Sequence, residues 1–195
     1  MPTPLRLAAL TLALLLPGAA AAQSTAAVST SSPRVLADGT DRVKGDDGER
    51  IHIRSTATYD PVSGEYELVV TNIDTGEVLR RVVSLTNSVQ PTEAEEEAAQ
   101  YIIRQDPEIA ALIAAAEHEV VVQGGFPLVR EAGHACGPRS RCAMYDVMEI
   151  IPGQAAAERI RYVVVDLRTL SLFSNDLDPV NETNFANPAQ ARSSN

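Results

Sequence analysis

Apolar and polar residues alternate in two separate parts of the chain. In Arg50–Tyr59, apolar side chains recur at every second position and polar side chains fill the positions between them, which is typical of a β-strand with one buried face. Clusters of turn residues at 60–64 and 72–76 separate this segment from two further predicted strands, Tyr66–Thr71 and Val78–Leu85. Such short connections predict an antiparallel meander.

A helical spacing follows the first three strands. Thr92 is a candidate N-cap, and Glu95 three residues later completes a capping box. Asp106 and Pro107 then have the chemistry of a second N-cap and first helical residue. The sequence therefore predicts either two short helices or one helix kinked at Pro107. The apolar stripe is expected to include Ala98, Tyr101, Ile102, Gln105, Ile109, Leu112, Ile113 and Ala116.

Strand patterns resume after the helices. The expected strands are Val120–Gln123, Phe126–Arg130, Cys142–Ile151, Arg159–Asp166 and Ser171–Phe173, with a bulge or bend at Gly124-Gly125. The predicted fold is a single α+β domain over 48–176, in which an antiparallel sheet of about six to seven strands packs on a kinked helical segment. Residues 23–47 and 177–195 lack apolar periodicity and are predicted to be a disordered leader and a flexible tail.

Two short stretches resemble each other within the chain. Val69–Leu79 and Val163–Phe173 both match the pattern of a strand, a turn that opens with Asn or Asp and contains Thr, and a second strand. Either a duplicated unit or two independent hairpins with the same turn chemistry would give this pattern, and the sequence leaves both open.

The first 22 residues have the pattern of a secretory signal peptide. A single cation, Arg6, precedes the apolar run Leu7–Leu16, and Ala20–Ala22 supply a cleavage site before Gln23. The run is shorter than the roughly 20 apolar residues that a membrane span needs, which disfavours the alternative of an uncleaved anchor. We therefore expect a periplasmic or secreted bacterial protein, with no membrane span after signal cleavage.

Charge and the absence of known motifs narrow the function classes. The formal net charge is -10, which argues against nucleic acid as a partner. The hydrolase patterns G-x-S-x-G and H-E-x-x-H do not occur, and no glycine-rich phosphate loop is found. We therefore expect a protein that is not an enzyme and that needs no cofactor.

Two cysteines, Cys136 and Cys142, are separated by a short segment that contains Gly137 and Pro138. Cysteine pairs in exported proteins are usually oxidised. The sequence therefore predicts a structural disulfide, which stabilises the fold by about 2 kcal/mol in the loop-closure treatment.

The helical region and the strands after it resemble known exported domains. The pattern P-T-x-x-E begins at Pro91, D-P follows at Asp106, and the later strands end in V-V-V-D-L-R-T. This arrangement resembles the cystatin-like N-terminal domains of copper amine oxidases, and its closing hairpin resembles PepSY-type exported modules. The resemblance covers about Pro91–Phe173 and implies a helix cradled on an antiparallel sheet. The H-x-H copper motif and the Asn-Tyr-Asp/Glu cofactor motif of those oxidases are absent, so it implies the fold and not the oxidase chemistry.

Cationic side chains surround the predicted disulfide loop of this acidic chain. They are Arg130, His134, Arg139 and Arg141. Arginines on a rigid loop can hold a carboxylate, a phosphate or an acidic protein surface with paired hydrogen bonds. The alternative is that they pair with acids of the same chain. The expected function is an exported non-enzymatic binding module for another extracytoplasmic protein or a small acidic ligand, in an accessory or inhibitory role at the cell envelope.

Two other functions remain open at this stage. His134, Cys136, Cys142 and Met144 could together bind Cu(I), which would make the protein a periplasmic copper-handling protein, although oxidation would remove both thiolates. A pocket that holds His134 or His118 next to a carboxylate would favour an enzyme. An uncovered face of the sheet would be a further partner site.

Overall fold

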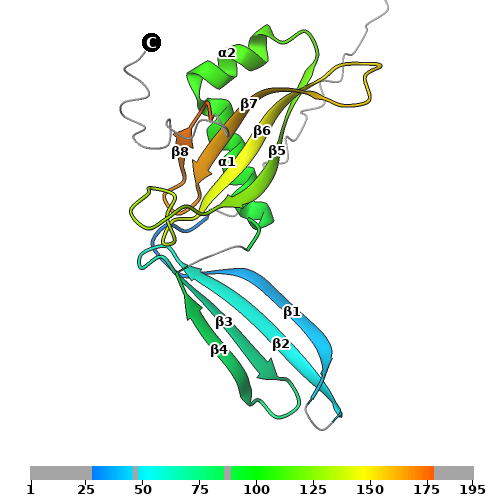
Figure 1. Ribbon diagram of the computed structural model, residues 1–195, viewed down its shortest axis with the longest axis vertical. Helices are drawn as coiled ribbons and strands as arrows, with labels where there is room; N and C mark the ends of the chain where they lie inside the picture. The colour runs from blue at the N-terminus through cyan, green and yellow to red at the C-terminus, as the bar shows by residue number, and fades with distance from the viewer. Residues whose placement is uncertain (1–27, 46–47, 86–88, 178–195) are drawn as a thin grey trace, which may run out of the picture.

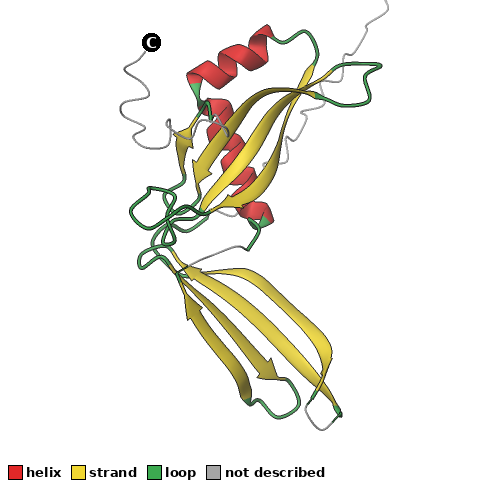
Figure 2. Ribbon diagram, in the orientation of Figure 1, coloured by secondary structure: helices red, strands yellow, loops and turns green. Residues whose placement is uncertain are grey.

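The computed structural model describes residues 28–45, 48–85 and 89–177. The predicted signal peptide and all of the predicted tail except Leu177 lie outside these residues. The described chain forms two four-stranded antiparallel sheets and two helices, and each sheet is a simple meander in sequence order (Figures 1 and 2). Among these residues, no helix is both long enough and apolar enough to cross a membrane.

The first sheet, here called sheet A, contains the strands β1 (Arg34–Lys44), β2 (Arg50–Asp60), β3 (Glu65–Asn72) and β4 (Val78–Ser84). The second, sheet B, contains β5 (Glu119–Leu128), β6 (Cys142–Ile150), β7 (Glu158–Asp166) and β8 (Ser171–Ser174). Helices α1 (Glu93–Gln105) and α2 (Pro107–Ala115) lie between the two sheets in sequence, and α1 packs on β7 and β8 of sheet B.

The prediction of one sheet on a kinked helical segment is therefore wrong. Eight strands form two separate sheets, and the helices cover only one of them. The strands after 48 were each anticipated, but β1 lies within 23–47, the stretch predicted to be a disordered leader. The sequence of β1 lacks alternation because most of its side chains are exposed at the edge of an uncovered sheet.

Sheet B is covered by the helices on one face and, near the disulfide, on part of the other face. On one face, buried side chains of the helices meet those of the central strands, in a core of Ala99, Ile103, Ile109, Val122, Ala143, Tyr145, Val147, Val163, Val165 and Leu167. On the other face, Cys136, Cys142, Val164 and Leu177 form a second buried cluster against which Met144 packs. Leu177, predicted to begin a flexible tail, is therefore part of this core and donates its backbone N–H to Tyr162 O.

The helix boundaries follow the predicted caps. The Thr92 hydroxyl accepts from the Glu95 N–H, and the Glu95 carboxylate accepts in return from the Thr92 N–H at 2.9 Å. The Asp106 carboxylate caps α2, and Pro107 is its first residue, so the segment forms two helices. The predicted apolar stripe was wrong at Tyr101, which is 67% exposed, because the buried side of α1 carries Glu95, Ala99 and Ile103.

The two similar stretches do form equivalent hairpins. Asn72 Oδ1 accepts from the Asp74 backbone N–H at the turn between β3 and β4. Asp166 Oδ1 accepts in the same way from Arg168 at the turn between β7 and β8. Each side chain thus fixes its turn through a hydrogen bond to the backbone two residues later.

The expected irregularity in β5 is a β-bulge. The register with β6 shifts between Gly124 and Phe126, and both Gly124 and Gly125 have positive φ. A Cβ on Gly124 would lie 2.9 Å from the carbonyl oxygen of Met144, so the close approach of the two strands also requires glycine.

Candidate functional site

A fully buried carboxylate, that of Glu95, holds the two sheets together. Arg141, which directly precedes β6, donates to it through Nε and Nη2, each at 2.6 Å. Arg34, the first residue of β1, donates through Nε and Nη2 at 3.0 and 2.8 Å. One arginine from each sheet therefore binds the same carboxylate, in an arrangement that we call the Arg34–Glu95–Arg141 triad.

The remaining donors of the triad are also satisfied. Arg34 donates to the carbonyl oxygens of Ser29 and Leu167, and Arg141 donates to those of Val89 and Gln90. With the Thr92 N–H included, five donors surround the Glu95 carboxylate. This shell leaves little room for a ligand at the carboxylate, so the triad is a structural connection between the sheets.

The electrostatics of the triad keep Glu95 ionised. Burial alone would raise the pKa of this carboxyl group, but the hydrogen bonds and charge of Arg141, with help from Arg34, bring the pKa below its usual value. A group with a lowered pKa is a poor candidate for a general acid near neutral pH. The triad is therefore suited to stabilising the contact between the two sheets and not to proton transfer.

Tyr59 of β2 lies beside the triad. We call the triad, Tyr59 and the contacts of Arg139 and Arg168 described below the junction between the two sheets. The Tyr59 ring lies beside both guanidinium groups, 5.2 Å from that of Arg34 and 5.7 Å from that of Arg141. The side chain is fully buried, and this burial raises its pKa to about 12. The aromatic ring thus packs against both cations in the place where sheet A meets sheet B.

A second set of contacts joins the disulfide loop to the turn between β2 and β3. Arg168 donates to the carbonyl oxygens of Pro61 and Val62 at 2.6 and 2.7 Å, and Arg139 donates to that of Ser63 at 3.3 Å. A Cβ on Gly64 would lie only 2.5 Å from the Arg139 carbonyl oxygen. Gly64 is therefore required by this close approach as well as by its positive φ.

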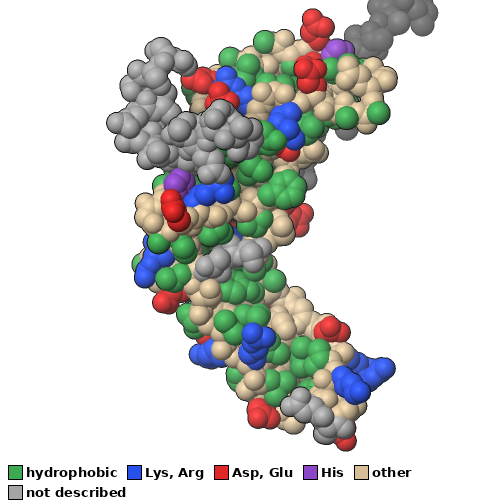
Figure 3. Space-filling view, viewed as in Figure 1, with side chains coloured by type: hydrophobic (Ala, Val, Ile, Leu, Met, Phe, Trp, Pro, Cys, Tyr) green, Lys and Arg blue, Asp and Glu red, His purple; other side chains and the backbone are tan. Residues whose placement is uncertain are grey.

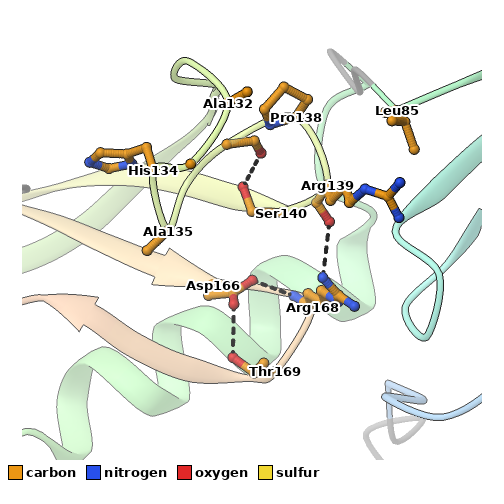
Figure 4. A pocket seen from close by; sticks show the side chains of 12 residues that line it. Leu85, Ala132, His134, Ala135, Pro138, Arg139, Ser140, Asp166, Arg168 and Thr169 are labelled. Atoms are coloured by element: carbon orange, nitrogen blue, oxygen red, sulfur yellow. Dashed lines mark hydrogen bonds between the residues drawn. The ribbon is translucent and has the colours of Figure 1, made fainter.

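Next to these contacts is a hollow of about 500 Å³. Residues of the disulfide loop and of the β7–β8 turn line it, with Leu85 from the end of sheet A (Figure 4). Its charged lining residues are Arg139, Arg168 and Asp166. Both Arg168 and Asp166 make hydrogen bonds within the fold. The Arg168 guanidinium donates to the carbonyl oxygens of Pro61 and Val62, and Asp166 accepts from the Arg168 amide and from the Thr169 hydroxyl. Arg139 is exposed, and within the described residues only its Nη1 makes a side-chain hydrogen bond.

The structure separates the four predicted loop residues. His134 and Arg139 line the hollow. Arg141 does not, because its guanidinium is buried on Glu95. Arg141 thus follows the alternative that the sequence left open, in which a cation of the loop pairs with an acid of the same chain, here through two hydrogen bonds to one carboxylate. Arg130 ties the base of the loop through its backbone N–H, which donates to Cys136 O at 2.8 Å.

Three residues of the junction had no role beyond local structure in the sequence prediction. Glu95 was assigned only as a helix cap, Arg168 only as part of a turn, and Arg34 was placed in the leader. Their sequence separations from their partners range up to 133 residues, and no local sequence pattern predicts such contacts. The capping box was the one signal that placed Glu95 at a helix end.

The predicted disulfide is confirmed, with an S–S distance of 2.05 Å between Cys136 and Cys142. Both cysteines are buried, and the bond leaves neither as a thiolate ligand. The Nδ1 atom of His134 accepts from the Cys136 N–H at 2.9 Å, and its ring lies 6.0 Å from that of Phe173. Within the described residues, no three His, Cys, Asp or Glu side chains come together as a metal site. The copper-binding alternative therefore loses both of its sulfur anions.

His118 does have an adjacent carboxylate. Its Nδ1 lies 3.0 Å from Oε1 of Glu149, and the hydrogen bonds from His118 lower the pKa of Glu149. Neither residue lines the hollow, and the pair is partly exposed. This pair therefore joins the start of β5 to the end of β6 outside the hollow.

Sheet A has an open surface next to this junction. No described helix or second sheet lies over it, and apolar side chains appear on its surface between charged ones (Figures 1 and 3). On one face the register places Val35, Thr58, Glu67 and Val83 in a row, and the two valines are 54% and 58% exposed. Elsewhere on the sheet, Asp38 pairs with Arg54, whose hydrogen bond lowers the pKa of Asp38 to about 2.

Comparison with known proteins gives no family: no family model and no curated protein matches the chain. The functional argument therefore rests on the residues and the geometry described above.

Proposed function

We propose that the chain is an extracytoplasmic, non-enzymatic binding module that docks a partner protein on sheet A. The observation that carries the proposal is the contrast in burial: sheet A has exposed apolar residues on a face that no described element covers, whereas sheet B packs against the helices on one face and against the disulfide on part of the other. Uncovered apolar surface on an otherwise satisfied fold is typical of an interaction site. An accessory or inhibitory role toward an envelope protein is the form of this function that we favour.

Two further features support the proposal. The disulfide fits an oxidising compartment outside the cytoplasm. The junction holds sheet A through the Arg34–Glu95–Arg141 triad and the contacts of Arg168, so a partner would meet an ordered surface and not a loosely tethered one. Such preorganisation reduces the entropic cost of binding.

Affinity capture with paired surface variants tests this function. The mature protein would be used as bait to capture partners from the native cell envelope. The test variant carries both Val35→Glu and Val83→Glu. The control is Tyr101→Glu, at an exposed position of α1. We expect the wild type and the control to recover the same partner, and the test variant to recover at least tenfold less. Equal recovery by all three proteins, or no specific partner for the wild type, would contradict the proposal.

A small acidic ligand at the hollow is a second candidate function, favoured by the exposed guanidinium of Arg139. Titration with citrate and with inorganic phosphate, followed by NMR of the loop amides, tests it. We expect saturable shifts around residues 132–140 in the wild type and none in Arg139→Ala. Shifts that persist in the variant would exclude Arg139 as the anion-binding group.

A further inference from the structure

We propose that the free edge of β4 binds an extended acidic segment of the partner, which adds a fifth strand to sheet A. This inference rests on the proposed function, because it names the part of sheet A that is engaged and the chemistry of the segment that binds. Strand addition uses backbone N–H and C=O groups at an open sheet edge for affinity and alternate side chains for specificity.

The two sheets have four edges, and three of them are poor templates. Strand β8 has only four residues. Strand β5 is interrupted by the bulge at Gly124 and by Pro127, which has no N–H to donate. Strand β1 is bulged between Val35 and Ala37 and carries charges of both signs. Bulges and prolines of this kind prevent pairing at sheet edges.

Strand β4 differs from these three edges. Its register with β3 shifts between Val70 and Thr71, but the residues Arg80–Ser84 pair one-to-one with β3, from Val70 to Tyr66, so this part of the edge is regular. The strand contains three valines and a leucine, which favour extended backbone. Val78, Leu79 and Val83 are among the exposed large apolar residues of the molecule. The edge is therefore regularly paired over the five residues Arg80–Ser84, which include two valines, and exposed apolar side chains continue beyond them at Val78 and Leu79.

Charge decides the nature of the occupant. Strand β4 contains two arginines and no acid, in a chain with a net charge of -10. Arg81 forms an ion pair with Glu67 at 3.2 Å, whereas Arg80 forms no ion pair with any described residue. Since opposite charges across a strand pair are stabilising and like charges are destabilising, these arginines disfavour a cationic strand and favour an acidic one. Pairing with β4 of a second copy of the chain is disfavoured, because it would place two more arginines and no acidic residue at this edge.

The register specifies the pattern that the segment needs. Arg80 and Val82 project to one face of sheet A, and Arg81 and Val83 project to the other. On each face, an arginine is thus followed by a valine two residues later. An added strand that carries acidic residues opposite the arginines and β-branched residues opposite the valines would match both faces.

Hydrogen exchange with designed peptides tests this inference. The probes are a ten-residue peptide of alternating pairs of glutamate and valine, and a matched peptide with lysine in place of glutamate, each added to the full mature chain. We expect the glutamate peptide to slow exchange at least tenfold at alternate amides of β4, because only every second N–H of an edge strand faces the added strand. The lysine peptide should leave β4 unchanged.

Two charge-reversal variants complete the experiment. Arg80→Glu should weaken the response to the glutamate peptide at least tenfold, and Arg42→Glu on the opposite edge of sheet A should leave it unchanged. Protection on β1 or sheet B, an equal response to both peptides, or no response at millimolar peptide would overturn the inference. In the capture experiment, full recovery of the partner by Arg80→Glu would overturn edge pairing while leaving sheet A as the docking surface, so the two failures are distinguishable.

Discussion

Sheets A and B have the same number of strands in the same meander order, yet they bury their side chains differently. Sheet B lies between two helices and the disulfide loop, and its central strand β7 has three consecutive fully buried valines, 163–165. In sheet A, no residue of β3 is fully buried, and β4 is mostly exposed. The comparison indicates that the core of sheet B and the junction supply most of the stability, which leaves the surface of sheet A available for recognition.

The largest effect is expected from removing the carboxylate that joins the two regions. Glu95→Ala would leave two buried guanidinium groups without a counter-charge, and breaking a buried ion pair in this way costs about 3–5 kcal/mol. Urea unfolding would measure the loss. Glu97→Ala, on the exposed side of the same helix, is the control and should change stability by less than about 0.5 kcal/mol. Similar values for the two variants would show that the triad is not what stabilises the junction.

A matched pair of valines tests the comparison directly. Val147→Ala in sheet B removes a fully buried side chain and should cost about 2–3 kcal/mol through lost burial and the cavity left behind. Val83→Ala in sheet A removes an exposed side chain and should cost less than about 0.5 kcal/mol. Thermal unfolding of both variants gives the difference. A large loss for Val83→Ala would mean that sheet A contributes more to stability than its exposure indicates.

The disulfide should have a somewhat smaller effect. Replacing both Cys136 and Cys142 by serine is expected to cost about 2 kcal/mol, because the bond closes a short loop. The loss should also loosen the contact of Arg139 with the β2–β3 turn, since that residue lies within the bonded loop. Unfolding with and without reductant in the wild type is the matching measurement. Identical stability of the oxidised and reduced proteins would contradict a stabilising role.

The smallest effect expected is a dependence on pH. Because the folded-state pKa of Glu95 is lowered, its contribution is fully present above its unfolded-state pKa of about 4.3 and is lost as the pH falls through the folded-state value. Stability should therefore fall in acid, and Glu95→Gln should show a shallower fall from a lower starting value. Unfolding curves between pH 7 and pH 3 measure both slopes. Parallel slopes would assign the acid sensitivity to other carboxylates, such as Asp38 and Asp60, whose pKa values are also lowered.

Local chemistry made much of the fold predictable. Alternation located β2, strand patterns between turn residues located β3, β4, β6 and β7, and the caps at Thr92 and Asp106 located both helices. The short spacing of Cys136 and Cys142 was sufficient for the disulfide. Each of these signals lies within a few residues of the structure that it specifies.

The division into two sheets could not be predicted in the same way. Strand β1 is held at its start by Arg34, through contacts with Glu95 and Leu167 that lie far along the chain, and its exposed positions carry no hydrophobic period. The same reason applies to Arg141, because four cations near a loop cannot be told apart from the sequence. Only tertiary contacts separate Arg141, which is buried, from Arg139, which is exposed.

The order of the triad along the chain also has a consequence for how the protein is made. The strands of sheet A are consecutive and joined by short turns, so its hydrogen-bonded ladders can close soon after residue 84 has been synthesised. Glu95 follows with Arg34 already present, but Arg141 appears 46 residues later. A nascent chain therefore passes through a stage in which the carboxylate has one of its two arginines. The junction can be completed only after Arg141 and Leu167 have emerged, so the two sheets are joined late in synthesis.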